Sequence, residues 1–564
     1  MSCVLSRLPG VSGRRASRRS FVALSALAGL GLPVLAGCDL PGASKDKGGS
    51  ASRSGSTAGG SATTSASAPA KAGSTEWQKL DGHVMGHKVS VEVSPVVRQD
   101  DKTSYIAVKL TRASDDASVD AVDASSYSSK DNKLSISDYL GAAPFRAGTG
   151  ASLVKLLDTS SGRVWSAVNG SGLLLELAPG EDMTSYLSFG KVDTDTVTVM
   201  VPMAGFTTVS VLDANDAKKA KIDLSIAQAA LKQSSHAVPE LADPVAIERY
   251  TRALDDSTST HAGGKDITVT LASDVTFASD SADLASGAEA QLKTVAGQLA
   301  QYPDGGTLTI VGHTDDIQDD AYNQTLSEKR ANAVKTRLEQ LTKLDKWKTS
   351  VSGKGESQPK IKDTTDEARA ANRRVEITLT PTGGTTAQKA APSTGTLPEA
   401  KGPVAKGPDG VTVTVDGSKD QVTITLDHVI RTGGYLLGQV QTTTRATKNS
   451  IHNFDQWLED KEMYHLNSRG EDASAGITEF AADGLTLLAG NERIYPADYL
   501  DAEFKAHVPL TELGLIPSIK AGTITVCVVW PDPGGDTVTL DHAAPRKEIS
   551  DYAYRLTDIP VKNS

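Results

Sequence analysis

The residues best suited to chemistry in this sequence of 564 residues are an aspartate and an arginine that lie near each other along the chain. Asp315 follows a short apolar run that predicts a strand, and Arg330 lies in the helical pattern that comes next. A carboxylate accepts hydrogen bonds from an ammonium group, and a guanidinium can hold a carboxylate by two parallel N–H bonds. A chain that returns from strand to helix brings the two side chains together. They then form either a site for a charged ligand or an internal salt bridge.

Motifs of enzymes and metal sites are not evident elsewhere in the sequence. The ten histidines are scattered, no His-Glu-x-x-His occurs, and no cysteine pair could hold zinc. Gly353-Lys354-Gly355 lacks the earlier glycine and the following Ser or Thr of a phosphate-binding loop. No Gly-x-Ser-x-Gly elbow is evident, and no pair of acids stands out from ordinary surface acids. We therefore expect a protein that is not an enzyme and that holds no metal or cofactor.

The elements that would position Asp315 and Arg330 alternate between strand and helix. Apolar residues predict strands at 267–271 and 308–311, around residue 351, and at 374–379. Two helical faces lie between them, formed by Ala288, Leu292, Val295 and Leu299, and by Ala331, Val334, Leu338 and Leu341. Thr325-Leu-Ser-Glu328 has the form of a capping box, which marks a helix start. The order β-α-β-α-β-β predicts a central α/β sandwich with its helices on one side of a mixed sheet.

An ordered set of short motifs in this region is similar to a known family. The set comprises Val275-Thr-Phe277, Asp280-Ser-Ala-Asp-Leu284, Ile310-Val-Gly-His-Thr-Asp315, Tyr322-Asn323, Leu326-Ser327, Arg330-Ala331, Gly353-Lys-Gly-Glu356 and Asn372-Arg-Arg-Val-Glu376. Together the motifs resemble the OmpA-like peptidoglycan-binding domain over residues 263–382, about a fifth of the chain. A lone Gly-His-Thr-Asp would be weak, but the ordered set is specific.

The resemblance implies both a ligand and a site. The ligand of the family is the diaminopimelate of the peptidoglycan stem, which carries an ammonium and a carboxylate on one carbon. Asp315 would accept from the ammonium and Arg330 would hold the carboxylate, helped by the positive N-terminal end of the helix. The resemblance places five more residues in the pocket: Asn323, Thr314, Asp280, Arg373 and Arg374. Two alternatives stay open, because Asn323 could instead fix the loop and only one of the adjacent arginines could face the site.

Residues 1–37 have the three parts of an export signal. Four arginines between positions 14 and 19 form a basic region, Phe21 to Leu35 is apolar, and Leu35-Ala-Gly-Cys38 follows. The last motif resembles the bacterial lipobox, which implies cleavage before Cys38 and attachment of lipid to it. Ser17-Arg-Arg-Ser-Phe21 resembles the twin-arginine export motif, although the same arginines would also serve the general secretion route. Residues 38–76 are rich in Ser, Gly, Ala and Thr and predict a disordered tether.

Two β-sandwich-like domains, at 77–214 and 407–564, are predicted on either side of the central module. Runs such as Val89-Ser-Val-Glu-Val93 and Val422-Thr-Ile-Thr-Leu426 have the alternation of strands. Residues 195–202 match 522–531, and Gly162-Arg-Val-Trp165 matches Glu492-Arg-Ile-Tyr495. We predict that the domains are diverged copies, the alternative being a chance likeness of β-rich segments. A connector of mixed helical character (215–262) and an extended linker (383–406) join the modules.

The net charge excludes one class of binding partner, and the cysteine content excludes an internal disulfide. The formal net charge is −11, and the first 37 residues carry five arginines and no acid, so the processed chain is more acidic still. An acidic chain repels nucleic acid, which excludes nucleic-acid binding as a main role. With Cys3 in the leader and Cys38 lipidated, Cys527 has no internal disulfide partner. Its apolar surroundings in the sequence predict a buried side chain.

These features predict a lipid-anchored protein on the extracytoplasmic side of a membrane in the bacterial cell envelope. Lipid on Cys38 would hold the membrane and the central domain would hold peptidoglycan, while the β-domains would present surfaces to other envelope proteins. Two other interpretations remain: a solute- or signal-binding lipoprotein, and a wall-targeted enzyme or regulator. A deep pocket with converging polar groups in a β-domain would favour either of these.

Overall fold

The computed structural model describes residues 70–564 except 85, 117–132, 136–150, 170–175, 233–240, 279, 386–396, 415–418, 446–450, 453, 461–480, 502–505, 514, 516–517, 520 and 544–551. The described residues belong to one compact unit. The predicted export signal, Cys38 and nearly all of the predicted tether lie outside them. Among the helices described, none has both the length and the apolar character needed to cross a membrane.

The strands predicted for the first β-domain are present, and side chains in β1 and β2 alternate between buried and more exposed positions. The elements are β1 (Gln78–Val84), β2 (His87–Val93), β3 (Val96–Arg98), β4 (Ser104–Arg112), β5 (Leu134–Ser135), β6 (Ala151–Asp158), β7 (Arg163–Asn169), β8 (Glu176–Leu177), β9 (Asp182–Phe189), β10 (Thr196–Val201), β11 (Gly205–Asp213) and the 3-10 helix η1 (Ala214–Asp216). Strands β5 and β8 form a separate pair.

The sheet of this first domain closes on itself. Hydrogen-bonded pairing runs β3-β4-β9-β7-β6-β10-β11, and β11 returns to pair with β3 in parallel. We predicted a sandwich, in which two sheets are hydrogen-bonded separately, and the closed path corrects that detail. Period-two alternation identifies strands and their buried faces, but it does not determine which strands pair across long loops.

The second β-domain is built from elements of the C-terminal part of the chain. They are β19 (Val404–Lys406), β20 (Val411–Thr414), β21 (Gln421–Thr425), β22 (Val429–Thr432), β23 (Tyr435–Arg445), β24 (Ile451–His452), η2 (Phe454–Trp457), β25 (Thr486–Ala489), β26 (Glu492–Ile494), β27 (Asp498–Leu500), β28 (His507–Pro509), β29 (Ser518–Ile519), β30 (Ala521–Pro531), β31 (Thr537–His542) and β32 (Tyr554–Asn563). Strand β30 pairs with β23 alone among the described strands. Cys527 on β30 is fully buried, as predicted.

The two domains have the same strand order. The first runs β1-β2-β4-β3-β11-β10-β6-β7-β12 and the second runs β20-β21-β23-β22-β32-β31-β25-β26-β13. In each order the fourth pair is parallel and the other pairs are antiparallel. This agreement supports the predicted duplication, and it matches β7 with β26, as Arg163 and Arg493 indicated. It corrects the other segment match, because β10 corresponds to β31, whereas β30 corresponds to β9.

The connector is mainly extended in its second half, where we predicted mixed helical character. It contains the helix α2 (Leu224–Lys232) and the strands β12 (Val245–Ala246), β13 (Arg249–Ala253) and β14 (Thr258–Gly263). Strand β12 extends the first β-domain at β7, and β13 extends the second at β26. Strand β14 pairs with both β13 and the first strand of the central module, so one continuous sheet links that module to the second β-domain.

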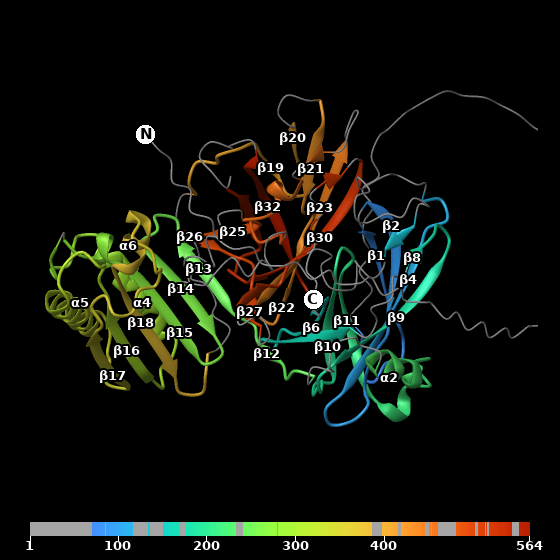
Figure 1. Ribbon diagram of the computed structural model, residues 1–564, viewed down its shortest axis with the longest axis horizontal. Helices are drawn as coiled ribbons and strands as arrows, with labels where there is room; N and C mark the ends of the chain where they lie inside the picture. Colours follow the sequence, from blue (N-terminus) through green and yellow to red (C-terminus); the bar gives the residue numbers. More distant parts are fainter. Residues whose placement is uncertain are drawn as a thin grey trace, which may run out of the picture. The chain divides into compact units, whose positions relative to one another are not determined.

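The central module has the predicted order of strands and helices, with two short helices added. It contains β15 (Asp266–Ala272), α3 (Ser273–Thr276), α4 (Ala288–Ala300), β16 (Gly306–Gly312), α5 (Asp320–Leu341), β17 (Trp347–Gly353), α6 (Asp366–Asn372) and β18 (Arg374–Pro381). The strands pair in the order β17-β16-β18-β15, and only β16 and β17 are parallel. Buried residues of α4 and α5 share one core with the strands, so both helices cover one face of the sheet (Figure 1).

Helix α5 begins five residues before the predicted capping box. Its N-cap is Asp319, whose carboxylate accepts from the backbone N–H of Tyr322 at 2.9 Å. Thr325 lies inside the helix, and its hydroxyl donates to the carbonyl of Ala321 at 2.9 Å. A threonine can make that bond in any helical turn, so the letters of a capping box also occur within helices. Arg330 therefore lies in about the third turn, too far along for the helix dipole to act strongly.

Candidate functional site

A hollow of about 420 Å³ lies in the central module, beside the end of β16 and the first half of α5. Six of the seven residues predicted for the site line it: Asp280, Thr314, Asp315, Asn323, Arg330 and Arg373. Segments that are distant in sequence meet here because β16 pairs with β18 in antiparallel fashion. The C-terminal end of β16 therefore lies beside the residue that precedes β18, Arg373.

Glycines at the ends of β16 and β17 let α5 approach the sheet closely. A Cβ atom at Gly312 would collide with the backbone carbonyl of Ser327, and one at Gly353 would collide with its hydroxyl. The same hydroxyl is buried and accepts from the N–H of Gly355 at 3.0 Å. This close packing places Arg330, one turn further along α5, beside the loop that leaves β16.

Arg330 is 4% exposed and supplies the buried cation of the hollow. Its guanidinium carbon lies 5.2 Å from the ring centroid of Phe277, and Nε donates to the carbonyl of Ser281 at 2.9 Å. Within the described part of the chain, its two terminal nitrogens have no hydrogen-bond partner. Burial lowers the pKa of Arg330, and three nearby carboxylates oppose that shift. The side chain remains a cation, because arginine titrates far above neutral pH, and its terminal N–H groups can donate to a ligand.

Asp315 pairs with Arg373 rather than with Arg330. The Nη1 of Arg373 donates to Oδ2 of Asp315 at 2.7 Å, and the same guanidinium holds both oxygens of Asp274 at 2.8 and 2.7 Å. The bonds to Asp274, opposed by burial and joined by that to Asp315, raise the pKa of Arg373. Oδ1 of Asp315 accepts only a long bond of 3.4 Å, from the N–H of Ile317, so it can still accept from a ligand.

Two buried hydroxyls and one exposed carboxylate complete the polar lining. Oγ1 of Thr314 and Oγ of Ser273 are buried and have no hydrogen-bond partner among the described residues. Asp280 is exposed and has a φ of 52°, and its Oδ1 accepts from the hydroxyl of Tyr322 at 2.9 Å. The hydroxyls and the second oxygen of Asp280 are therefore available to a polar ligand.

Asn323 fixes the loop after β16, one of the two roles considered for it. Its Nδ2 lies 3.2 Å from the carbonyl oxygen of Asp315 and 3.0 Å from that of Gln318. It also lies 2.6 Å from Oε2 of Glu356. An amide group has only two hydrogens to donate, so these three acceptors use its donor capacity.

Arg374 does not line the hollow, which corrects its prediction as a site residue. Its side chain is 6% exposed, and its Nε donates to Oε1 of Glu376 at 2.7 Å. Successive side chains along an extended chain point to opposite sides, so Arg373 and Arg374 cannot both face the hollow. His313 is buried nearby, and burial first, then the charge of Arg374, lowers its pKa. His313 is therefore neutral at pH 7.

Several lining residues were not predicted as site residues, although Tyr322 belongs to one of the family-like motifs. Ser273 and Asp274 begin the short helix α3, and Tyr322 lies in the first turn of α5. Asp274 lies three residues after the end of the strand predicted at 267–271, so its position shortly after a strand was the only available signal. Its bond to Arg373 could not be inferred, because the two residues are separated by 99 positions.

The arrangement can hold a small group that carries both charges. A guanidinium with available N–H donors, the carboxylates of aspartates and two hydroxyls that have no partner among the described residues line the same hollow. The residues that line the hollow include no histidine or cysteine, so it offers no typical transition-metal ligand set. Neither hydroxyl is bonded to a base that could activate it as a nucleophile. The arrangement is suited to binding a small polar group that carries both charges.

A second hollow, of about 300 Å³, lies where the connector meets both β-domains. Its lining includes Arg163 from the first domain, Arg249 from the connector and Tyr435 from the second. The guanidinium of Arg249 lies 4.7 Å from the ring centroid of Tyr435. Because this hollow forms at a junction and not inside a β-domain, it is not the deep β-domain pocket that would favour a solute-binding protein or an enzyme.

Comparison with known proteins identifies the central module. Residues 276–373 match the OmpA family, so the chain contains an OmpA family domain. Outer membrane porin F of Pseudomonas aeruginosa is 43% identical over 103 residues, which are 18% of this chain and 29% of that protein. The probable lipoprotein YiaD of Escherichia coli is 35% identical over 119 residues, 21% of this chain and 53% of that protein.

Among solved structures, the peptidoglycan-associated lipoprotein of Burkholderia pseudomallei is 28% identical, with a TM-score of 0.17. That match covers 18% of this chain and 86% of the other. The chain thus spans between about a third and a half of the curated relatives that it matches. The names of these proteins refer to an outer membrane porin, a probable lipoprotein and a peptidoglycan-associated lipoprotein.

Proposed function

We propose that the central module binds peptidoglycan non-covalently, through the diaminopimelate of the peptide stem. The observation that carries the proposal is the hollow in which the buried Arg330 keeps N–H donors available beside Asp280 and Asp315. Arg330 would hold the carboxylate of the ligand by two parallel bonds, and the aspartates would accept from its ammonium group. The name of the relative from Burkholderia pseudomallei, a peptidoglycan-associated lipoprotein, agrees with this ligand.

The wider proposal is that the protein tethers a membrane to the cell wall. Lipid on Cys38 would hold the membrane, and residues 38–76 would span the gap to the wall-binding module. The β-domains would then present surfaces to other envelope proteins. The lipobox-like Leu35-Ala-Gly-Cys38 and a relative named as a probable lipoprotein support the lipid end of this tether.

The test is sedimentation of the full chain, with Cys38→Ser to remove the lipid, together with insoluble peptidoglycan. We expect Arg330→Ala and Asp315→Ala each to weaken binding by at least about 30-fold, because each removes a charge-assisted contact worth about 2 kcal/mol or more. Arg337→Ala is the matched control. This arginine lies on the same helix but binds Glu289 at 2.7 Å, away from the hollow, so binding should not change.

The choice of peptidoglycan tests the ligand itself. A wall that has lysine in place of diaminopimelate lacks the carboxylate beside the terminal amine, so it should bind weakly. Full binding of the Arg330 and Asp315 variants would refute the site. Equal binding to both kinds of wall would refute diaminopimelate as the ligand.

A further inference from the structure

Three side chains of types that ligate metals meet where the chain passes between the two β-domains. Glu248 stands between β12, which extends the first domain, and β13, which extends the second. His261 lies on β14 and His507 lies on β28. The ligand atoms of the three side chains all lie within 4.8 Å of one another.

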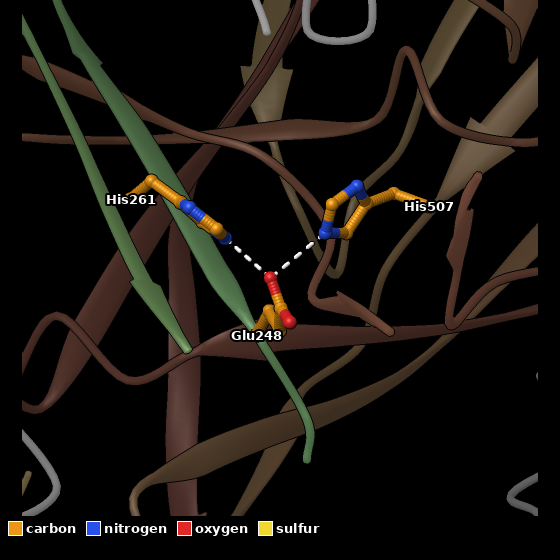
Figure 2. Close-up of side chains that lie close together, drawn as sticks. All are labelled: Glu248, His261 and His507. Carbon is orange, nitrogen blue, oxygen red and sulfur yellow. Dashed lines mark hydrogen bonds and ion pairs between the residues drawn. The ribbon is translucent and has the colours of Figure 1, made fainter. Parts of the chain in front are cut away.

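Both imidazoles face the same carboxylate oxygen, as Figure 2 shows. Nε2 of His507 lies 2.8 Å from Oε2 of Glu248, and Nε2 of His261 is hydrogen-bonded to that oxygen as well. The two rings are nearly perpendicular, at 89°, with their centroids 5.6 Å apart. A tetrahedral zinc ion with bonds of about 2.0 Å holds its ligand atoms roughly 3.3 Å apart. Small side-chain rotations would therefore exchange the shared hydrogen bonds for metal bonds.

The local backbone makes room for the carboxylate between the histidines. Gly263 lies two residues after His261 on the same strand, and a Cβ atom there would lie 2.6 Å from Cδ of Glu248. The side chains of Glu248 and His507 are 14% and 11% exposed, whereas that of His261 is 34% exposed. The cluster is thus mostly enclosed but open to solvent on one side, through which an ion and a water molecule could enter.

We propose that Glu248, His261 and His507 bind a divalent transition-metal ion of the zinc class, with water as the fourth ligand. Two imidazoles and one carboxylate suit zinc and its neighbours, whereas calcium and magnesium prefer oxygen ligands alone. Three protein ligands leave one coordination position open. None of the three residues lines the hollow of the central module, so this proposal stands apart from peptidoglycan binding.

A metal ion at this place would join three parts of the fold. Glu248 belongs to the crossing between the β-domains, and His261 belongs to the hairpin that leads into the central module. His507 belongs to the second β-domain. The ion would therefore hold the connector against the second domain and limit motion at the start of the central module, in addition to the pairing of β13 with β26.

The test is zinc binding by the full chain after chelator treatment and removal of the chelator. Equilibrium dialysis against zinc chloride should yield one tightly held ion per chain, and cobalt in its place should give the visible bands of a tetrahedral site. His261→Ala and Glu248→Gln should each weaken zinc binding by more than about 100-fold, because each removes a direct ligand. His428→Ala is the control, since that histidine instead pairs with Asp427 at 2.6 Å and should not affect the ion.

The folding of each variant is checked by its thermal midpoint in the presence of chelator. His261 is the most exposed of the three ligands, so its alanine variant should fold even if the Glu248 variant does not. Failure of the full chain to retain zinc would overturn the proposal. Unchanged zinc affinity in the folded His261 variant would also overturn it, because the three side chains would then be a hydrogen-bonded cluster and not a metal site.

Discussion

At the scale of single residues, the adjacent arginines Arg373 and Arg374 have different surroundings. Arg373 lines the hollow and orders Asp274 and Asp315, whereas Arg374 is buried and bonded to Glu376. Arg373 turns toward the hollow and Arg374 toward the core, because they are neighbours in an extended segment. The division separates a residue that shapes the site from one that stabilises the module.

The first prediction at this scale contrasts these two arginines. Arg374→Ala should lower the stability of the module by about 1–3 kcal/mol, because it leaves polar groups around Glu376 unpaired. Peptidoglycan affinity per folded molecule should change little. Arg373→Ala should have the opposite profile, with weaker binding and a smaller loss of stability. Thermal melting and wall sedimentation of both variants measure this contrast, and an equal loss of binding in the two would contradict the assignment.

The start of helix α5 is the feature that matters most at the element scale. Asp319 caps the helix, and the turn that follows carries Tyr322 and Asn323 into the hollow. The cap therefore positions the rim of the site, whereas the threonine of the predicted capping box, Thr325, lies within the helix and bonds to the preceding turn.

We expect Asp319→Ala to cost about 1 kcal/mol of stability, because the N–H of Tyr322 loses its acceptor. Thr325→Ala should be nearly neutral, since this residue is exposed and does not cap the helix. Hydrogen–deuterium exchange should become faster in the first turn of α5 in the Asp319 variant alone. Faster exchange in the Thr325 variant instead would mean that the helix begins where its sequence motif suggests.

At the scale of the whole molecule, a buried glutamate joins the two β-domains. Glu512 is 1% exposed, and its Oε2 accepts from the N–H of Met203 in the first domain at 2.9 Å. The same oxygen accepts from the N–H of Cys527 in the second domain at 3.4 Å. Burial raises the pKa of Glu512 to about 7, although both backbone bonds oppose the shift. This carboxyl group therefore couples the junction to pH.

The sign of that coupling gives the last prediction. The folded protein holds the proton of Glu512 more tightly than the unfolded chain does, so stability should fall as pH rises from about 4.5 to about 7. Glu512→Gln keeps an acceptor without the charge and should stabilise the protein by about 1–3 kcal/mol at pH 8, with little change at pH 4.5. Melting curves across this range, with Glu339→Gln as an exposed control, measure the effect. A variant that is no more stable than the wild type at pH 8 would contradict it.

The sequence by itself determined the features that depend on local pattern. Alternation predicted strands such as β2 and β21, and helical spacing predicted the buried faces of α4 and α5. The ordered motifs from Val275 to Glu376 indicated the OmpA family domain, which the family match confirms. Such patterns are readable because burial acts on neighbouring residues with the period of the element that carries them.

Only the tertiary structure decided which distant groups meet. Asp315 could have paired with Arg330, but antiparallel pairing of β16 with β18 supplies Arg373 instead. Glu248 and His507 are 259 positions apart, so no spacing motif could reveal their cluster. The closed path of the first sheet and the true match of β10 with β31 likewise depend on strand pairing across long loops. The period of buried side chains is a local property of the sequence, whereas strand pairing is a property of the whole folded chain. The pairing of the strands could therefore not be derived from the side-chain period.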